Sequence, residues 1–167
     1  MIRLNFTLFL FIIFSFGAYS QKVDVEGLKN DVKKVKKDLR SDLGELRFDG
    51  TKSTYYEVKR EDSYKDIEVI LFLRNNYTVF FDGNAGTGKV TLRIFDKAPH
   101  HDDRILLYEV RNIVNKKTKI TEKELNETLR MFDPDPPKLR SIHLEYEISK
   151  GRKPNRGAVV MMLGFDD

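Results

Sequence analysis

The chain has 167 residues, no cysteine, and 30 Lys and Arg residues against 26 Asp and Glu residues, a net charge of +4. Lacking cysteine, it has no disulfide, no thiolate zinc site and no cysteine nucleophile. The balanced charge does not resemble the concentrated positive charge of a nucleic-acid binder, so we expect no nucleic acid partner.

Residues 1–20 have the pattern of an export signal. Arg3 precedes an apolar run at 8–16 that is too short to span a bilayer, and Ala18 and Ser20 are the small residues read at cleavage. We expect a mature chain starting at Gln21, periplasmic or secreted, and without a transmembrane span. The absence of cysteine from an exported protein favours a bacterial source. Because an exported protein rarely meets nucleotide, we expect no nucleotide ligand.

Residues 21–48 are predicted to form an amphipathic helix. Its apolar side chains are spaced three and four apart and form one stripe: Val25, Leu28, Val32, Val35 and Leu39. We expect the stripe to lie against the protein's own domain. Two alternatives are pairing with a partner chain, which would make the protein a structural subunit, and lying on a membrane.

Residues 49–167 are predicted to form a β-rich globular domain. Apolar and polar residues alternate with the period of a strand around 56–58, 67–73, 77–81, 90–95 and 141–148. The segment 104–114 is expected to be a strand, and the apolar run 158–163 a buried one. Asn75-Asn76 predicts a two-residue hairpin that pairs Leu71 with Phe80 and Ile70 with Phe81.

One further short helix is predicted near 121–132. Thr121 and Glu124 have the spacing of a capping box, and Leu125, Leu129 and Phe132 form the apolar face before a proline-rich stop at 133–137. The predicted fold class is therefore mainly β or α+β. We expect an antiparallel, sandwich-like domain of about six to eight strands with an N-terminal amphipathic helix.

The glycine-rich segment 83–89 resembles a phosphate loop up to Lys89. The next residue is Val90, where that loop needs Ser or Thr, and a strand follows instead of a helix. Asp82, Asn84 and Gly86 match only the start of a calcium loop. We expect a turn between two strands, and no cofactor.

Two histidine segments carry an enzymatic alternative. His100, His101 and Asp102 are weak metal candidates in a predicted solvated loop, and His143 shares a strand face with Glu145. Together they would suit an extracytoplasmic hydrolase or metal-dependent enzyme. An exposed polar sheet face explains the second pair equally well.

The segment 150–157 concentrates positive charge in a predicted loop, at Lys150, Arg152, Lys153 and Arg156. Loops on a rigid sheet often carry binding, and the acidic partners outside the cytosol are polysaccharides, lipid head groups and proteins. The sequence therefore favours an exported, non-catalytic binding module that recognises an envelope component, a glycan or a protein partner through its loops.

Overall fold

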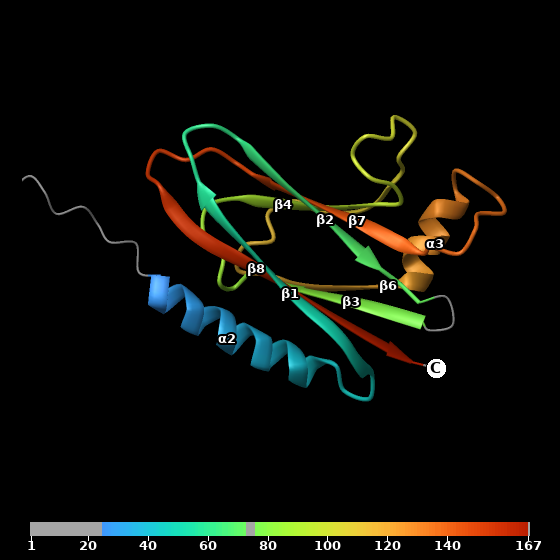
Figure 1. Cartoon of the computed structure of the whole chain (residues 1–167), viewed down its shortest axis with the longest axis horizontal. Coiled ribbons are helices and arrows are strands. Elements are labelled where there is room, and N and C mark those ends of the chain that lie inside the picture. Colours follow the sequence, from blue (N-terminus) through green and yellow to red (C-terminus); the bar gives the residue numbers. More distant parts are fainter. Residues whose placement is uncertain (1–24, 73–75, 167) are drawn as a thin grey trace, which may run out of the picture.

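A computed structural model describes residues 25–72 and 76–166 (Figure 1). The predicted export signal lies outside these residues. The elements, in chain order, are α2 (Val25–Asp42), β1 (Arg47–Val58), β2 (Ser63–Ile70), β3 (Asn76–Asp82), β4 (Val90–Phe95), β5 (Leu106–Val110), β6 (Lys117–Thr121), α3 (Glu122–Arg130), β7 (Ser141–Ile148) and β8 (Asn155–Asp166). The predicted fold class is confirmed, with the amphipathic helix and the further short helix in place.

The strands form two four-stranded antiparallel sheets that stack as a sandwich. Sheet 1 has the order β1-β8-β3-β6, and sheet 2 has the order β2-β7-β4-β5. Side chains from the inner faces of both sheets, together with Leu125 and Leu129 of α3, make one core. Most chain connections pass from one sheet to the other, as in sandwiches with crossing connections.

The hairpin predicted at Asn75-Asn76 is wrong. β2 pairs with β7 in sheet 2, whereas β3 pairs with β8 and β6 in sheet 1. The two strands bury their apolar residues from opposite sides of the core, so that Val69 and Phe81 belong to the same core cluster without lying in the same sheet. Phe80, on the other face of β3, packs beneath α2.

β8 is buried on both faces. Val159, Met161 and Leu163 point into the core of the sandwich, and the alternate residues Ala158 and Val160 belong to the cluster under α2. Such a strand reads as a continuous apolar run because neither face meets water. The prediction of a buried strand at 158–163 is confirmed.

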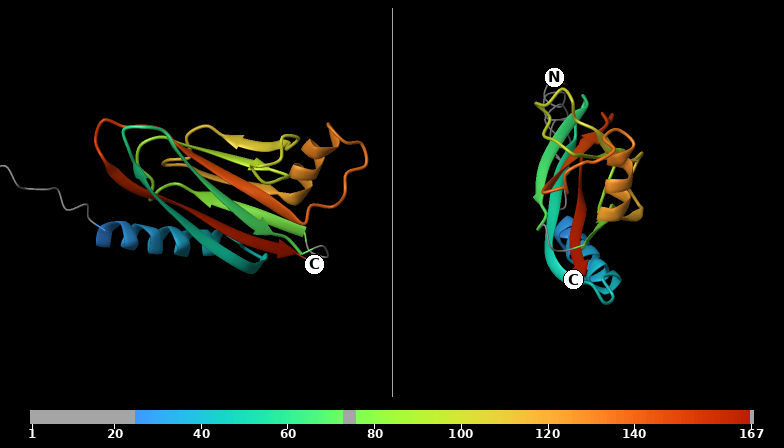
Figure 2. Two further views of the ribbon diagram at one scale, coloured as in Figure 1. Left: turned by 45° about the horizontal axis from the view of Figure 1, so that its top comes forward. Right: turned by 90° about the vertical axis from the view of Figure 1, so that its right-hand side faces the viewer.

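α2 covers the outer face of sheet 1 (Figure 2). Val32, Val35 and Leu39 are buried against β8 and β3, which confirms for these three residues the expected packing on the protein's own domain. Leu28 is partly buried against the same cluster, and Val25 is 44% exposed. Gly44, at a φ of +58°, follows the end of the helix in the left-handed conformation that glycine adopts without strain.

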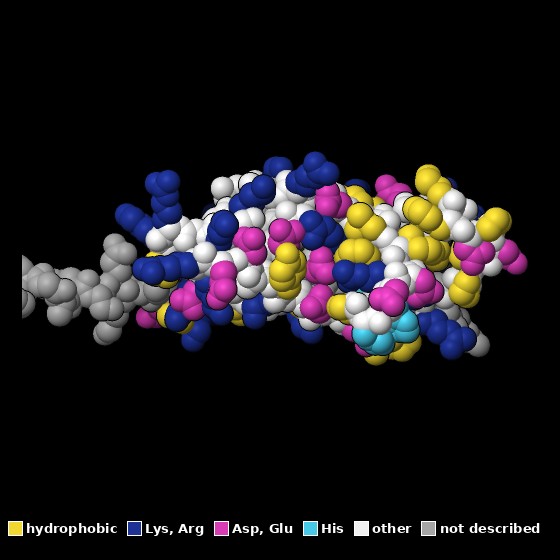
Figure 3. All heavy atoms as spheres, turned by 90° about the horizontal axis from the view of Figure 1, so that it is seen from above, with side chains coloured by type: hydrophobic (Ala, Val, Ile, Leu, Met, Phe, Trp, Pro, Cys, Tyr) yellow, Lys and Arg dark blue, Asp and Glu magenta, His cyan; other side chains and the backbone are white. Residues whose placement is uncertain are grey.

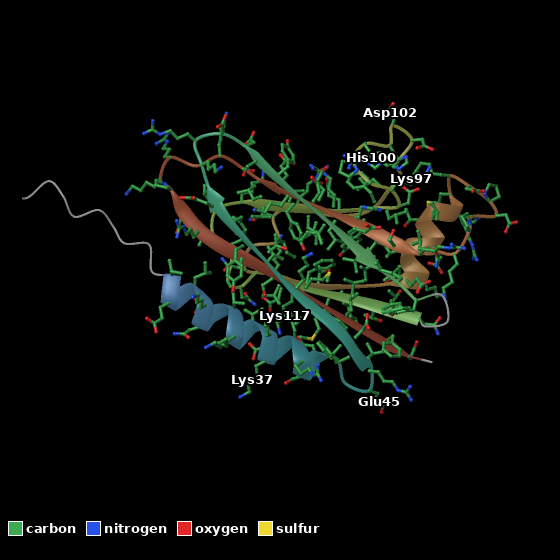
Figure 4. All side chains as sticks on the ribbon, in the orientation of Figure 1. Lys37, Glu45, Lys97, His100, Asp102 and Lys117 are labelled. Carbon is green, nitrogen blue, oxygen red and sulfur yellow. The ribbon has the colours of Figure 1, made fainter. Side chains whose placement is uncertain are left out.

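A lysine ties the C-terminal end of α2 to sheet 1. The Lys117 ammonium lies 2.8 Å from Asp42 of the helix and 3.8 Å from the fully buried Asp82 of β3 (Figure 4). The hydrogen bond to Asp42 raises the pKa of Lys117. Asp82 also accepts a 2.7 Å hydrogen bond from the Asn84 amide, so one carboxylate oxygen bonds the turn and the other faces the Lys117 ammonium. This arrangement does not present it to a calcium ion.

α3 begins as predicted. Thr121 is the N-cap, and its side chain and that of Glu124 each accept from the other's backbone amide. The buried Leu125 and Leu129 form the apolar face. Phe132 was predicted to join them and does not, because the helix ends at Arg130 and the Phe132 side chain is 66% exposed.

Candidate functional site

Three loops meet at one end of the sandwich. They are the turn 59–62 between β1 and β2, the loop 83–89 between β3 and β4, and the loop 149–154 between β7 and β8. The Gly151 amide donates to the Lys59 carbonyl at 2.8 Å, and the Ser149 amide donates to the Lys89 carbonyl at 3.0 Å. These backbone hydrogen bonds fix the loops relative to one another. We call this end, with its charged side chains, the basic end.

The glycine-rich loop is anchored from below by a tyrosine. The buried Tyr56 hydroxyl donates to the Thr87 carbonyl and accepts from the Thr87 amide, each at 2.9 Å. Burial raises the pKa of Tyr56, which keeps the hydroxyl protonated and able to donate. The segment joins β3 to β4, and Val90 starts β4, as the sequence predicts.

Positive charge dominates the basic end. Its exposed basic side chains are Lys59, Arg60, Lys89, Lys150, Arg152, Lys153 and Arg156, and the acids beside them are Glu57, Glu61 and Asp62. Figure 3 shows the Lys and Arg side chains gathered over these loops at the left of the molecule. The structure thus places the four residues predicted from sequence together and adds three cations.

One of these acids, Asp62, binds a backbone amide. Asp62 accepts a 2.7 Å hydrogen bond from the Lys150 amide, so it holds the 149–154 loop against the β1–β2 turn. The sequence segment 150–157 contains no acid, but the folded surface has these neighbouring ones. The positive charge of the basic end is therefore partly compensated and still in excess.

A groove of about 580 Å³ continues from the basic end along the edges of β1 and β2. Tyr55 and Tyr64 line it with side chains that are 46% and 58% exposed. The other residues of the groove include the start of α2 and four cations: Val25, Leu28, Lys29, Tyr56, Glu57, Lys59, Ser63, Lys65 and Arg156.

Sequence reasoning missed this groove, although part of the signal was visible. Tyr55 occupies the exposed face of β1 with Glu57, because alternation puts Tyr56 and Val58 in the core. The facing wall comes from α2 and β2, and nothing in the spacing of residues predicts that those elements meet there. Val25 and Leu28, the first two members of the predicted apolar stripe, line the groove.

His143 and Glu145 lie on the outer face of sheet 2, where an arginine cluster binds the glutamate. Arg93 and Arg104 each contact the Glu145 carboxylate at 3.0 Å. The carboxylate facing His143 is that of Glu68, at 4.0 Å. The geometry therefore orients Glu145 toward two guanidinium groups and away from the role of a base partner for His143.

Arg93 is the centre of this cluster. Besides Glu145, it binds Glu109 at 3.0 Å and Glu147 at 2.7 Å, so one guanidinium holds three carboxylates from β5 and β7. Burial opposes its charge, but the hydrogen bonds outweigh that effect and raise the pKa of Arg93. Charge-assisted bonds of this kind fix β4 between its neighbours.

The weak metal candidates lie in the loop 96–105 between β4 and β5. The rings of His100 and His101 are 4.2 Å apart, and Asp103 pairs with Lys97 at 2.6 Å (Figure 4). In the part of the chain that the structure describes, no three His, Asp or Glu side chains, Asp102 included, are placed to hold a metal ion.

A second hollow, of about 680 Å³, lies between α3 and the start of β3. Its buried carboxylate, Glu122, accepts from the Tyr77 amide at 3.3 Å and lies 3.5 Å from the Lys138 ammonium. Both carboxylate oxygens thus have partners within the protein. Glu122 therefore anchors α3 to β3. Because its carboxylate is already bound within the protein, the basic end is the better candidate for a binding site.

Comparison of the chain with protein-family models, with curated proteins and with solved structures found no match. Across residues 25–72 and 76–166, no helix has both the length and the apolar character needed to cross a membrane. The functional assignment therefore depends on the geometry described above.

The anchoring of the glycine-rich loop predicts that Gly157→Ala destabilises the protein. A Cβ at Gly157 would lie 2.7 Å from the Thr87 amide nitrogen and the Tyr56 hydroxyl, so the loop or β8 must shift. We expect a loss of about 1–3 kcal/mol in the free energy of unfolding by urea. The matched control is Gly50→Ala in β1, where a Cβ meets nothing within 4 Å. Equal losses in the two variants would contradict this account.

The Arg93 cluster predicts a pH-dependent effect of Arg93→Gln. Hydrogen bonds from Arg111 and Arg93 lower the pKa of Glu109, so this carboxylate stabilises the fold above its unfolded pKa and loses that contribution as pH falls through its folded pKa. Without Arg93, Glu147 loses its ion pair, while Glu109 and Glu145 keep only Arg111 and Arg104, so negative charge is less well compensated at neutral pH. The variant should be less stable than the wild type at pH 7.

The difference between Arg93→Gln and the wild type should shrink as the pH is lowered past about 4, where carboxylates become protonated. Urea midpoints at neutral and acidic pH measure it. Arg111→Gln is the comparison, because it removes one hydrogen bond to Glu109 and leaves Glu145 and Glu147 bound to Arg93, so its loss of stability at pH 7 should be smaller. A loss of stability in Arg93→Gln that is independent of pH would show that this arginine does not compensate the charge of the carboxylates.

Proposed function

We propose that this protein is an exported, non-catalytic binding module that recognises an anionic ligand at the basic end. One observation carries the proposal: cations from three separate loops are held in one surface by backbone hydrogen bonds between those loops. The export part of the proposal depends on residues 1–20, whose composition is that of a cleaved signal.

The clustered cations attract an anion more strongly than separate cations do. An exposed lysine or arginine is screened within about 8 Å at physiological salt, whereas neighbouring cations add their potentials and attract a polyanion from solution. The loops are tied together before any ligand arrives. Binding therefore costs less conformational entropy than it would on a free loop.

Binding is favoured over catalysis by the environment of Glu145. The enzymatic alternative needs this carboxylate beside His143, and the two arginines that hold it also neutralise it. A structural role for the helix stripe is less favoured because Val32, Val35 and Leu39 are used inside the domain.

Neutralising the basic end should weaken polyanion binding. The test is the triple variant Arg152→Gln, Lys153→Gln, Arg156→Gln, with inorganic polyphosphate as the probe and calorimetry or polarisation as the measurement. We expect about a tenfold loss of affinity and a weaker dependence on salt, because fewer charges contribute to the attraction.

The control removes the same number of charges from the exposed face of α2, in the variant Lys33→Gln, Lys34→Gln, Lys37→Gln. It should retain affinity within about twofold, since these lysines lie outside the basic end. If the two triple variants bind polyphosphate equally well, the protein responds only to its total charge, and the proposed site is wrong.

A further inference from the structure

We infer that the ligand is an acidic polysaccharide whose chain lies in the groove along β1 and β2, with sugar rings packed on Tyr55 and Tyr64. This inference depends on the proposed function and gives the ligand a chemical class. It is carried by the two exposed aromatic rings that share a concave surface with cations.

Two exposed aromatic rings line the groove. Single exposed aromatic residues are normal on protein surfaces, but Tyr55 and Tyr64 come from different sheets and line the same groove. A tyrosine ring offers a flat apolar face with a polar tip. A pyranose ring offers a complementary face of C–H groups and a rim of hydroxyls, so the two can stack with dispersion contact while the hydroxyls keep their hydrogen bonds.

The groove carries an excess of positive charge. Lys29, Lys59, Lys65 and Arg156 line it, against the single acid Glu57. A neutral glycan would leave these cations without partners, whereas a uronic acid or sulfated sugar presents one anionic group per ring or per pair of rings. The groove therefore fits a ligand that combines apolar ring faces with regularly spaced anions.

The groove is continuous with the basic end. Lys59 and Arg156 belong to the groove and also to the basic end, so the positive surface has no break between them. The groove volume of about 580 Å³ is in the range of small-ligand sites, and the basic end extends beyond it. A polymer occupies both regions at once, and each region adds affinity.

The test compares two classes of polyanion, with and without apolar ring faces. Oligogalacturonate and a heparin oligosaccharide carry sugar rings, and polyphosphate carries charge alone. We expect Tyr55→Ser combined with Tyr64→Ser to weaken binding of at least one of the two oligosaccharides about tenfold and to change polyphosphate binding less than twofold, since only the oligosaccharides have ring faces that can stack on the tyrosines. The matched control is Phe132→Ser, because this exposed ring is not among the residues that line the groove, so the affinities for the oligosaccharides and for polyphosphate should be unchanged.

The outcomes separate the inference from the proposed function. If the tyrosine variant binds both oligosaccharides like the wild type while the Arg152, Lys153 and Arg156 variant loses polyphosphate, the binding function stands and the polysaccharide assignment is wrong. If wild type binds neither oligosaccharide, or binds a polyglutamate peptide more tightly with the same tyrosine dependence, the inference is also overturned. Circular dichroism of each variant confirms that the fold is kept.

Discussion

The burial of β8 on both faces is the constraint on which the rest of the structure depends. A strand with apolar side chains on alternate faces leaves one row exposed unless each face has its own cover. Sheet 2 covers the row that contains Val159 and Met161, and α2 covers the row that contains Ala158 and Val160. The N-terminal helix is therefore an integral layer of the fold.

β8 also holds the loops of the basic end in place. β8 begins beside the loop 149–154, and its Ala158 amide donates to the Ala85 carbonyl of the glycine-rich loop at 2.9 Å. Gly157, the residue before it, leaves the space in which Tyr56 reaches Thr87. The loops are thus attached to a strand that is buried on both faces, which fixes the backbones that carry the cations relative to one another.

Periodicity in the sequence identified most elements and their buried faces, because a period of two or of 3.6 is a property of neighbouring residues. It predicted the stripe on α2, the capping box at Thr121 and the buried run of β8. It could not decide which strands pair, and the predicted hairpin between β2 and β3 failed because those strands face each other across the core.

The sequence likewise predicted only the part of the candidate site that lies within one segment. Arg152, Lys153 and Arg156 stand out because they are close in sequence. Lys59 and Lys89 join them only through the crossing connections between the sheets, and Tyr64 reaches the groove from another strand. Alternation shows that Tyr55 is exposed, but it does not show what lies opposite. Sites assembled from several loops depend on strand order, which the sequence pattern does not encode.

Native-state hydrogen exchange tests the central claim most directly. If β8 couples the helix layer, the sandwich and the basic end, the amides of Ser149, Gly151 and Ala158 should exchange with protection close to that of the β8 core amides, whose opening requires global unfolding. Fast exchange at Ser149 and Gly151, with slow exchange confined to β8, would contradict the account, because the loops that carry the cations would then be mobile in the folded protein.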